Sequence, residues 1–287
     1  MKEIPVRKIV VSRKEPAFSA SFSIRNVAEL LSGGDMVQEL HRHDFFFILA
    51  LEKGKGYHEI DFTEFEVTGQ SIFFMRPGQV HHLRLKAGST GYLIGFQNDF
   101  YNPHQDSSNQ LLRDASKRNH YLVDRSTFRK LYTLLTEIFL EYTNKQDRYW
   151  DVIKSVLGIF LVELTRSTTG SGNNLSNKNL YVQERLDKFL ELVEANVSTH
   201  KKVSEYADML NLSAYQLNAI TKRAVGKTSS DIIDEYIILE SKRYLLATSN
   251  QVNQIAYQLG FDDVSYFIRF FRKHTGQTPD SFRNNLR

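Results

Sequence analysis

Over roughly the first hundred residues, the hydrophobic positions fall in short runs that end at turn residues. Residues 45–60 and 69–85 show the pattern, with Phe-, Ile- and Leu-rich stretches broken by Gly and Pro. Runs of about four to eight β-favouring residues, with turns every eight to twelve positions, are typical of an all-β barrel or sandwich. We therefore predict a β domain over residues 1–123.

The period of the pattern becomes helical from residue 124. Two segments, about 124–143 and 147–168, carry apolar residues at the three- and four-residue spacing of one helix face. These residues are Leu131, Leu134, Leu135, Ile138 and Phe139, then Val152, Val156, Ile159, Phe160 and Leu164. We predict an antiparallel helix pair over residues 124–168. Its apolar surplus favours homodimerisation over packing within one chain alone.

A polar stretch separates this pair from the rest of the chain. Residues 166–179 contain Gly, Ser, Thr and Asn with almost no apolar side chain, so they cannot pack a core. We predict a flexible linker over residues 169–179 and a helical domain over residues 180–287. The predicted fold class is therefore α+β, with a β-barrel and a helix pair followed by an all-α domain.

The helical domain contains an internal repeat, in which residues 207–226 resemble residues 256–276. Ala207, Leu210 and Leu212 match Ala256, Leu259 and Phe261 at an offset of 49. After one extra residue the offset is 50, and Leu217 and Gly226 match Phe267 and Gly276. In each unit a helix with a small inner residue precedes a tight turn and a second helix, which Ser213 caps in the first unit and Asp262 or Asp263 in the second.

Each unit has the pattern of a helix-turn-helix, although one unit alone reads equally well as an ordinary helical hairpin. In a helix-turn-helix, the second helix protrudes and its N-terminal residues can enter a major groove. Two units joined by a helical stretch, residues 229–246, could place their second helices roughly 34 Å apart, one turn of DNA. The repeat therefore favours double-stranded DNA as the partner, with two major-groove segments per monomer.

Composition excludes several classes of protein, but the net charge does not by itself indicate DNA as the partner. The chain has 287 residues, no cysteine and a net charge of only +4, and residues 178–287 hold 15 Lys and Arg against 13 Asp and Glu. No stretch has the length of a membrane span and no signal peptide opens the chain, so we expect a cytoplasmic protein. No Gly-rich phosphate loop, nucleophile elbow or paired-carboxylate motif is present, so we expect no enzyme of those classes and no cofactor.

The second unit resembles the DNA-binding domain of the arabinose-operon regulator (AraC/XylS) family of bacterial transcription factors. The resemblance rests on Ile255, Ala256, Gly260, Phe261, Ser265, Tyr266, Phe267, Arg269, Phe271, Arg272, Lys273, Gly276, Thr278, Pro279, Phe282 and Arg283. It covers about the last 105 residues closely and the β domain more loosely. It implies a transcriptional regulator, more often an activator, that contacts RNA polymerase, responds to a small-molecule effector and dimerises through the helix pair.

The resemblance also assigns roles to single residues. Phe267 and Phe271 are expected in the core. The expected DNA contacts in the first unit (about 204–225) are Ala214, Tyr215, Asn218, Ala219 and Lys222; those in the second (about 252–275) are Asp263, Val264, Ser265, Tyr266, Arg269, Arg272 and Lys273. Arg269 suits a guanine or a phosphate, and Asn218 suits an adenine. Arg272 and Lys273 suit phosphates or are solvated charges. Thr221, Ala219 and Tyr236 depart from the family pattern, which puts in doubt how much sequence specificity the first unit contributes.

The β domain resembles the cupin barrels through His41, His43 and the run from Pro77 to His82. In a strand, His41 and His43 share one face, and with His81 or His82 they could form an imidazole cluster for iron, zinc or nickel. A metal-dependent cupin enzyme with a helical appendage is therefore the alternative function, with Glu52 or Glu59 as its carboxylate. We favour an effector pocket without metal, formed by His41, His43, Phe45, Tyr57 and His81.

Overall fold

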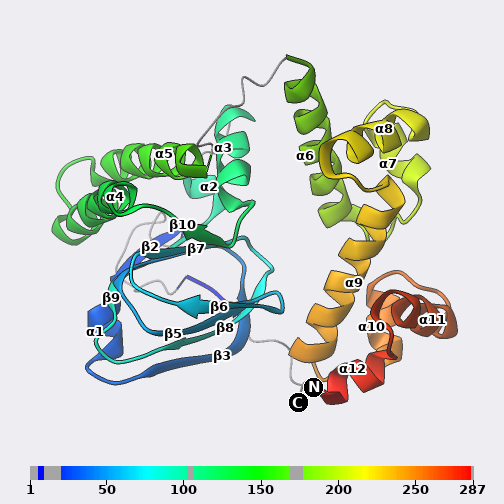
Figure 1. Ribbon diagram of the computed structural model, residues 1–287, viewed down its shortest axis with the longest axis horizontal. Helices are drawn as coiled ribbons and strands as arrows, with labels where there is room; N and C mark the ends of the chain where they lie inside the picture. The colour runs from blue at the N-terminus through cyan, green and yellow to red at the C-terminus, as the bar shows by residue number, and fades with distance from the viewer. Residues whose placement is uncertain (1–5, 10–20, 102–105, 169–176, 286–287) are drawn as a thin grey trace. The chain divides into compact units, whose positions relative to one another are not determined.

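The computed structural model describes residues 6–9, 21–101, 106–168 and 177–285. The chain divides into two compact units, Pro5–Gly172 and Asn173–Arg287, and each is described by itself (Figure 1). The division falls inside the predicted linker. Residues 169–176 of that linker lie outside the described residues, and its last three residues belong to helix α6 (Asn177–Asn196).

The described part of the N-terminal unit contains two five-stranded sheets, as the short hydrophobic runs predict. The first sheet has the order β1 (Val6–Arg7), β3 (Met36–His43), β8 (Val80–Leu85), β5 (Gly56–Ile60) and β6 (Thr63–Val67). The second has the order β10 (His120–Leu122), β7 (Ser71–Met75), β4 (Phe46–Lys53), β9 (Thr90–Phe96) and β2 (Phe22–Asn26). Among the described strand pairs, only β1–β3 is parallel.

The second sheet is buried on both faces, which explains why the middle of β4 shows no alternation of polar residues. Phe47 and Leu49 face the inside of the barrel, whereas Ile48 and Ala50 face a separate core beneath the helices. That outer core is covered by α4 (Arg125–Asn144) and α5 (Tyr149–Thr168), as Figure 1 shows. The unit also contains the short helices α1 (Val27–Leu31), α2 (Asn98–Tyr101) and α3 (Asp106–Ser116).

The helix pair forms where the sequence predicts it, but its buried face is turned slightly. In α4, Leu131, Leu135 and Ile138 are fully buried, as the periodicity indicates. In α5 the buried positions are Ile153, Leu157, Phe160, Leu161 and Leu164. Ile159, which the periodicity places with them, is 51% exposed, because Ile153 and Leu157 rather than its own face pack on the outer core.

The second unit is helical throughout its described residues, and it contains the predicted repeat. After α6 come α7 (Val203–Met209), α8 (Ala214–Val225), α9 (Ser229–Ala247), α10 (Val252–Gln258), α11 (Val264–Thr275) and α12 (Pro279–Asn285). The first helices of the two units begin 49 residues apart and the second helices 50 apart, which are the offsets of the sequence repeat. Among the described residues, no helix combines the length and apolarity needed to cross a membrane.

Candidate nucleic-acid interface and effector pocket

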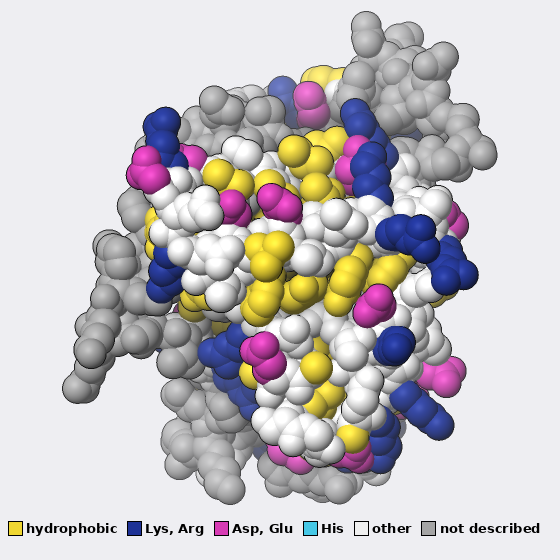
Figure 2. Space-filling view, turned by 90° about the vertical axis from the view of Figure 1, so that its left-hand side faces the viewer, with side chains coloured by type: hydrophobic (Ala, Val, Ile, Leu, Met, Phe, Trp, Pro, Cys, Tyr) yellow, Lys and Arg dark blue, Asp and Glu magenta, His cyan; other side chains and the backbone are white. Residues whose placement is uncertain are grey.

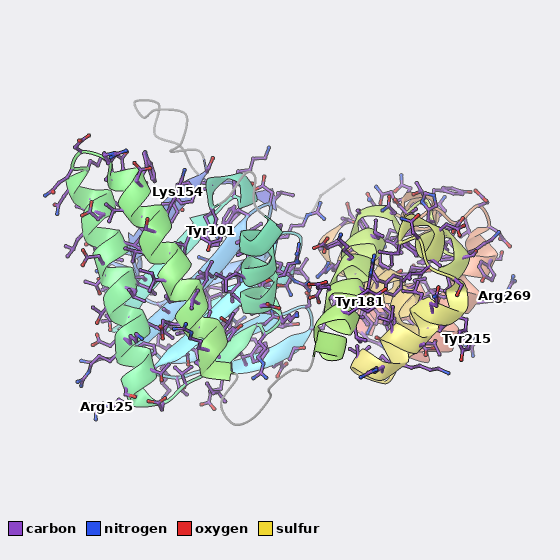
Figure 3. All side chains as sticks on the ribbon, turned by 90° about the horizontal axis from the view of Figure 1, so that it is seen from above. Tyr101, Arg125, Lys154, Tyr181, Tyr215 and Arg269 are labelled. Carbon is purple, nitrogen blue, oxygen red and sulfur yellow. The ribbon has the colours of Figure 1, made fainter. Side chains whose placement is uncertain are left out.

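Tyr215 on α8 and Arg269 on α11 both project at the same edge of the helical unit (Figure 3). Each helix starts at a capping side chain. Ser213 Oγ accepts from the N–H of Gln216 at 3.2 Å, and Gln216 Oε1 accepts in return from the N–H of Ser213 at 2.8 Å. Asp263 accepts from the N–H of Ser265 at 2.7 Å, which selects Asp263 over Asp262 as the cap.

The core of the second unit is aromatic. Phe267 and Phe271 are fully buried, as predicted. Their rings pack against Phe261 and Phe282, with centroid distances of 5.1 and 5.6 Å. Since this core fixes one face of α11, the opposite face must be exposed.

The exposed face of α11 brings together the predicted contact residues. Ser265, Tyr266, Arg269, Arg272 and Lys273 are exposed, the cap Asp263 is exposed, and Val264 is half-buried. The Arg269 guanidinium lies 3.9 Å from the Asp263 carboxylate. Both side chains are well exposed, so this ion pair is weak and leaves the guanidinium available to a ligand.

Helix α8 of the first unit corresponds to α11 but makes different contacts. Ala214, Tyr215, Ala219 and Lys222 are exposed on α8, Tyr215 by 83%. Asn218, by contrast, is half-buried, and its Oδ1 accepts from the backbone N–H of Ser229 at 2.9 Å. Reading adenine with two hydrogen bonds requires that same oxygen, so in this structure Asn218 joins α8 to the start of α9.

The surroundings of Thr221 explain how the first unit can do without the phenylalanine that the family pattern has at this core position. Its side chain is fully buried, and Oγ1 lies 3.2 Å from both the Asn218 carbonyl oxygen and Ser229 Oγ, while Ser229 is itself buried. A buried hydroxyl is tolerated when it is hydrogen-bonded. The first unit therefore replaces part of an aromatic core with a polar contact between α8 and α9.

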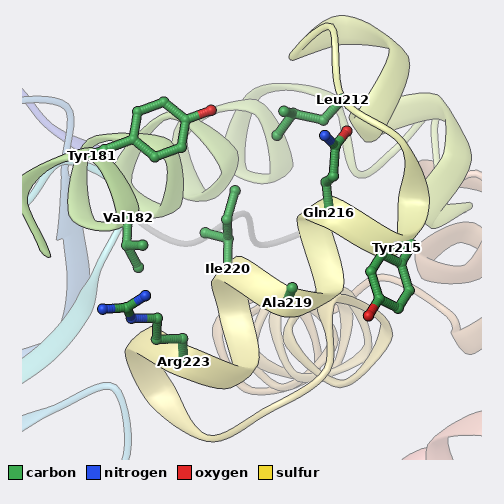
Figure 4. Close-up of a pocket in the computed structure, with 8 residues that line it drawn as sticks. All are labelled: Tyr181, Val182, Leu212, Tyr215, Gln216, Ala219, Ile220 and Arg223. Atoms are coloured by element: carbon green, nitrogen blue, oxygen red, sulfur yellow. The ribbon is translucent and has the colours of Figure 1, made fainter. Parts of the chain in front are cut away.

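A groove of about 540 Å³ lies between α6 and α8 and was not foreseen from the sequence (Figure 4). Its lining is mostly apolar: Tyr181, Val182, Leu212, Tyr215, Gln216, Ala219, Ile220 and Arg223. Tyr215 and Ala219 thus belong both to the groove and to the predicted reading face. Substitutions at these two positions change both surfaces, so Lys222 and Arg269 are cleaner probes of DNA contact.

Inside the barrel, three predicted histidines come together. His41 and His43 on β3 and His81 on β8 are all buried, and His41 and His81 are register partners. His81 Nε2 lies 2.9 Å from His43 Nε2 and 2.9 Å from His41 Nε2. His58, which no motif marked, completes the cluster, because its Nε2 lies 2.8 Å from His81 Nδ1.

Burial keeps this cluster neutral. It lowers the pKa of His41 to about 4 and those of His43 and His58 to about 3, and it holds the pKa of His81 well below its usual range. Charges on the neighbouring imidazoles and on Arg7 lower these pKa values further. Each ring therefore carries one N–H and one lone pair at neutral pH.

The hydrogen bonds then fix where the protons lie. His41 Nδ1 is 2.7 Å from the Glu39 carbonyl oxygen, which can only accept, so His41 Nδ1 donates and its Nε2 is a lone pair. His81 must therefore carry its proton on Nε2 and accept at Nδ1 from His58. His43 Nε2 also faces the His81 proton and must accept, which leaves the His43 proton on Nδ1.

The cupin resemblance raises the question of a metal ion, and the donor set fits one. One nitrogen from each of His41, His43 and His81 lies within 4.8 Å of the others, and imidazoles suit divalent transition metals. His58 and the Glu39 carbonyl stand behind two of these rings as orienting partners. Among the described residues, no carboxylate joins this group; Glu59 lies on the other face of β5 and Glu52 is exposed.

A cavity of about 270 Å³ opens beside the cluster. Of the predicted pocket residues, His43 and Phe45 line it, while His41 and His81 lie behind in the histidine cluster. Tyr57 is placed elsewhere: His58 and Ile60 are the buried residues of β5, so Tyr57 points to the opposite face, with its ring 6.4 Å from that of His82. The cationic residues Arg7, Lys8 and Arg25 also line the cavity, and the sequence motifs had not indicated them.

Comparison with known families agrees with both units. A model described as an AraC-like ligand binding domain matches residues 31–148, and one described as a helix-turn-helix domain matches residues 206–285. The transcriptional activator RhaS from an Enterobacter species is 24% identical over 246 residues, covering 85% of this chain and 86% of RhaS. RhaS from Yersinia pseudotuberculosis is 25% identical over 255 residues, covering 86% of this chain and 89% of its own.

Solved structures with some likeness include ToxT from Vibrio cholerae, at 13% identity, with 92% of this chain and 98% of ToxT covered and a TM-score of 0.44. The C-terminal domain of the response regulator yesN from Fusobacterium nucleatum is 29% identical, with 38% of this chain and 99% of that domain covered and a TM-score of 0.32. The two family models together span both compact units. The chain belongs to the AraC/XylS family of transcriptional regulators.

Proposed function

We propose that this regulator is a cytoplasmic activator that binds bipartite promoter sites through α8 and α11 and responds to a small molecule bound in its barrel. The observation that carries the proposal is the repeat itself. Two capped helices of equal length, 50 residues apart, carry exposed cationic side chains, and Tyr215 and Arg269 project from them at the same edge of the helical unit (Figure 3). Such a pair suits two successive major-groove segments.

Within this proposal, the two helices contribute unequally. Arg269 can donate two parallel hydrogen bonds to a guanine, and Ser265 and Tyr266 stand beside it at the start of α11. Arg272, Lys273 and Lys222 lie toward the helix ends, where they suit phosphates that set affinity more than sequence. On α8, Ala214, Tyr215 and Ala219 offer mainly apolar and hydroxyl contacts, so α8 contributes less to selectivity.

The helix pair is proposed to carry dimerisation. Leu140 on α4 and Ile159 on α5 are large apolar side chains that are about half-exposed, so they could be covered by a second copy of the chain. Figure 2 shows a band of hydrophobic side chains across one side of the N-terminal unit, with Lys and Arg side chains toward its edges. We assign residues 1–123 to effector sensing, 124–168 to dimerisation and 180–287 to DNA binding. Activation is inferred from the RhaS activators, and contact with RNA polymerase from the family resemblance.

A metal-dependent enzyme is the less favoured alternative. If the barrel holds an ion, His41, His43 and His81 would be its ligands, and the ion would supply an electrophilic centre for oxygen atoms of a bound molecule. The cluster has no carboxylate among its described neighbours to act as a general base. The barrel is thus better suited to binding a molecule than to transforming it.

The test is selection of binding sites from random DNA duplexes at two salt concentrations, with the full chain and with Arg269→Ala. The expected result is a bipartite site whose segments lie about one helical turn apart. Arg269→Ala should lose base preference in one segment only. Lys188→Ala, which removes an exposed charge from α6, is the matched control and should keep both segments.

Weak, unselective binding that falls steeply with salt would contradict the proposal. Equal loss of selectivity in Lys188→Ala would also contradict the role given to Arg269, because it would show that charge rather than position matters.

A further inference from the structure

Among the described residues, three exposed cations and no acidic side chain line the cavity beside the histidine cluster. Arg7 on β1, Lys8 after it and Arg25 on β2 all line its wall. Arg25 reaches it because β2 alternates, with Phe22 and Ile24 buried toward the outer core. None of the lining residues is acidic, and no described carboxylate forms an ion pair with these three cations.

The cavity wall also contains a buried donor without a well-formed hydrogen bond, which has only the backbone of Arg7 beside it. The proton positions of the cluster leave His43 with its N–H at Nδ1, and the residue is 5% exposed. Although the backbone of Arg7 lies beside this ring, Nδ1 has no partner with hydrogen-bond geometry. Gln38 Oε1, a buried acceptor from the same strand, is likewise without a partner. Buried polar atoms without partners are costly, so a ligand atom that pairs with either of these two would stabilise the complex.

The rest of the lining is apolar, and the cavity itself is small. Ile9, Leu30, Met36, Phe45, Phe47 and Leu93 form the rest of the wall, with Ser23. A volume of about 270 Å³ lies below the roughly 300–1,000 Å³ typical of drug-sized ligands. The cavity therefore fits a small molecule with a short apolar body, not a long chain.

From these contacts we propose that the effector of the barrel is a small organic anion, a carboxylic acid with an apolar body and a hydrogen-bond donor. Its carboxylate lies among Arg7, Arg25 and the His43 Nδ1–H, and its donor lies at Gln38 Oε1. An anion offsets the mutual repulsion of the three cations, and charged hydrogen bonds are stronger than neutral ones. The inference rests on the effector-sensing role of the proposed function.

The experiment is thermal unfolding of the full chain, dialysed against a chelator, in matched probe pairs. Benzoate is compared with benzamide, mandelate with mandelamide, and inorganic sulfate with both, at equal ionic strength. The acids should raise the melting temperature saturably, with mandelate above benzoate because of its hydroxyl. Their amides should bind about 10- to 100-fold more weakly, since they lack the charge.

Two variants locate the effect. Arg7→Gln/Arg25→Gln should remove the shift caused by the acids. Lys53→Gln/Lys55→Gln removes the same charge from exposed positions outside the cavity and should keep it. Because the acid and amide are also compared on the unaltered protein, the result does not depend on whether the double arginine variant folds.

Equal shifts from acid and amide, or no shift from any acid, would overturn the proposal. So would an equal shift from sulfate, since the apolar wall would then contribute nothing, or an acid shift that survives in the double arginine variant. Site selection on DNA separates this result from the proposed function. A chain that selects bipartite DNA but binds none of the acids loses only the anion inference.

Discussion

The two helix-turn-helix units have the same backbone and different interiors. Both second helices span 12 residues, begin at a capping side chain and end at a glycine in the left-handed region, Gly226 at φ +74° and Gly276 at φ +80°. Inside, the second unit packs Phe267 and Phe271, whereas the first packs Leu217 beside the hydrogen-bonded Thr221. The turn and cap chemistry therefore specifies the motif, and the core composition varies within it.

The exposed faces of α8 and α11 also differ. At equivalent positions, 50 residues apart, the first unit has Ala219 where the second has Arg269. A methyl group can contact a thymine methyl, but a guanidinium can read a guanine with two hydrogen bonds. Under the proposed function, the second unit would therefore select sequence and the first would mainly anchor the protein on DNA.

The largest effect is expected in the two cores. Phe271→Ala should cost about 3–5 kcal/mol of stability, because it opens a cavity among aromatic rings, whereas Thr221→Ala should cost about 1–2 kcal/mol. Denaturation of the helical unit can be followed by far-UV circular dichroism. Trp150, the single tryptophan, reports on the barrel unit and should not respond. Equal costs would break the distinction between the two interiors.

The second-largest effect is expected at the two equivalent exposed positions, Arg269 on α11 and Ala219 on α8. Arg269→Ala should weaken binding to the selected site by about 1–3 kcal/mol, since a bidentate guanine contact is lost. Ala219→Ser should change affinity by less than about twofold, as expected of a position without a strong contact. Fluorescence anisotropy on one labelled duplex measures both. A larger loss in the α8 variant would reverse the assignment of the two units.

Asn218 gives a smaller and more diagnostic effect. Because its Oδ1 is bonded to the Ser229 N–H, Asn218→Ala should lower stability by about 1 kcal/mol and leave the base preference of the first segment unchanged. Site selection and chemical denaturation with the same preparation distinguish the outcomes. Loss of adenine at one position with unchanged stability would return Asn218 to a reading role.

The smallest difference is expected at the terminal glycines. An alanine at Gly226 or at Gly276 would meet no atom within 4 Å, so only its positive φ is unfavourable. Each substitution should cost about 1 kcal/mol, and the two costs should agree. Melting curves of the two variants measure this. Unequal costs would show that the shared backbone is held more rigidly in one unit.

Local patterns predicted the helices of both units well. The offset of the repeat, the cap at Ser213, the buried Phe267 and Phe271 and the helix pair all depend on residues near one another in sequence. The hydrogen bond between Asn218 and Ser229 could not be predicted, because Ser229 lies on the next helix, where no periodicity records the contact. The rotation of α5 that exposes Ile159 likewise depends on the sheet beneath it.

The barrel was less predictable for the same reason. The motifs marked His41, His43 and His81, but His58 joins them only through strand pairing of β5 with β8. Arg7 and Arg25 come from strands in different sheets, so their meeting at one cavity is a tertiary event. Strand alternation could have placed Tyr57 outside, since His58 and Ile60 are the inward residues of that strand.

The buried imidazoles make the barrel the acid-sensitive part of the molecule. An unfolded chain binds protons at a histidine pKa near 6.5, whereas the folded pKa values are about 4 for His41 and about 3 for His43 and His58. Their contribution to stability is therefore complete above pH 6.5 and is lost as the pH falls toward 4, by up to about 1.4 kcal/mol per pH unit for each ring.

Mild acid should consequently melt the barrel, seen by Trp150 fluorescence, at a pH where circular dichroism still reports folded helices. A barrel melting temperature that stays flat between pH 7 and pH 5, in chelator-treated protein, would contradict this. Acidification would then have the effect of removing the N-terminal domain. The helices of the C-terminal unit would stay folded, while the barrel that is proposed to sense the effector would not.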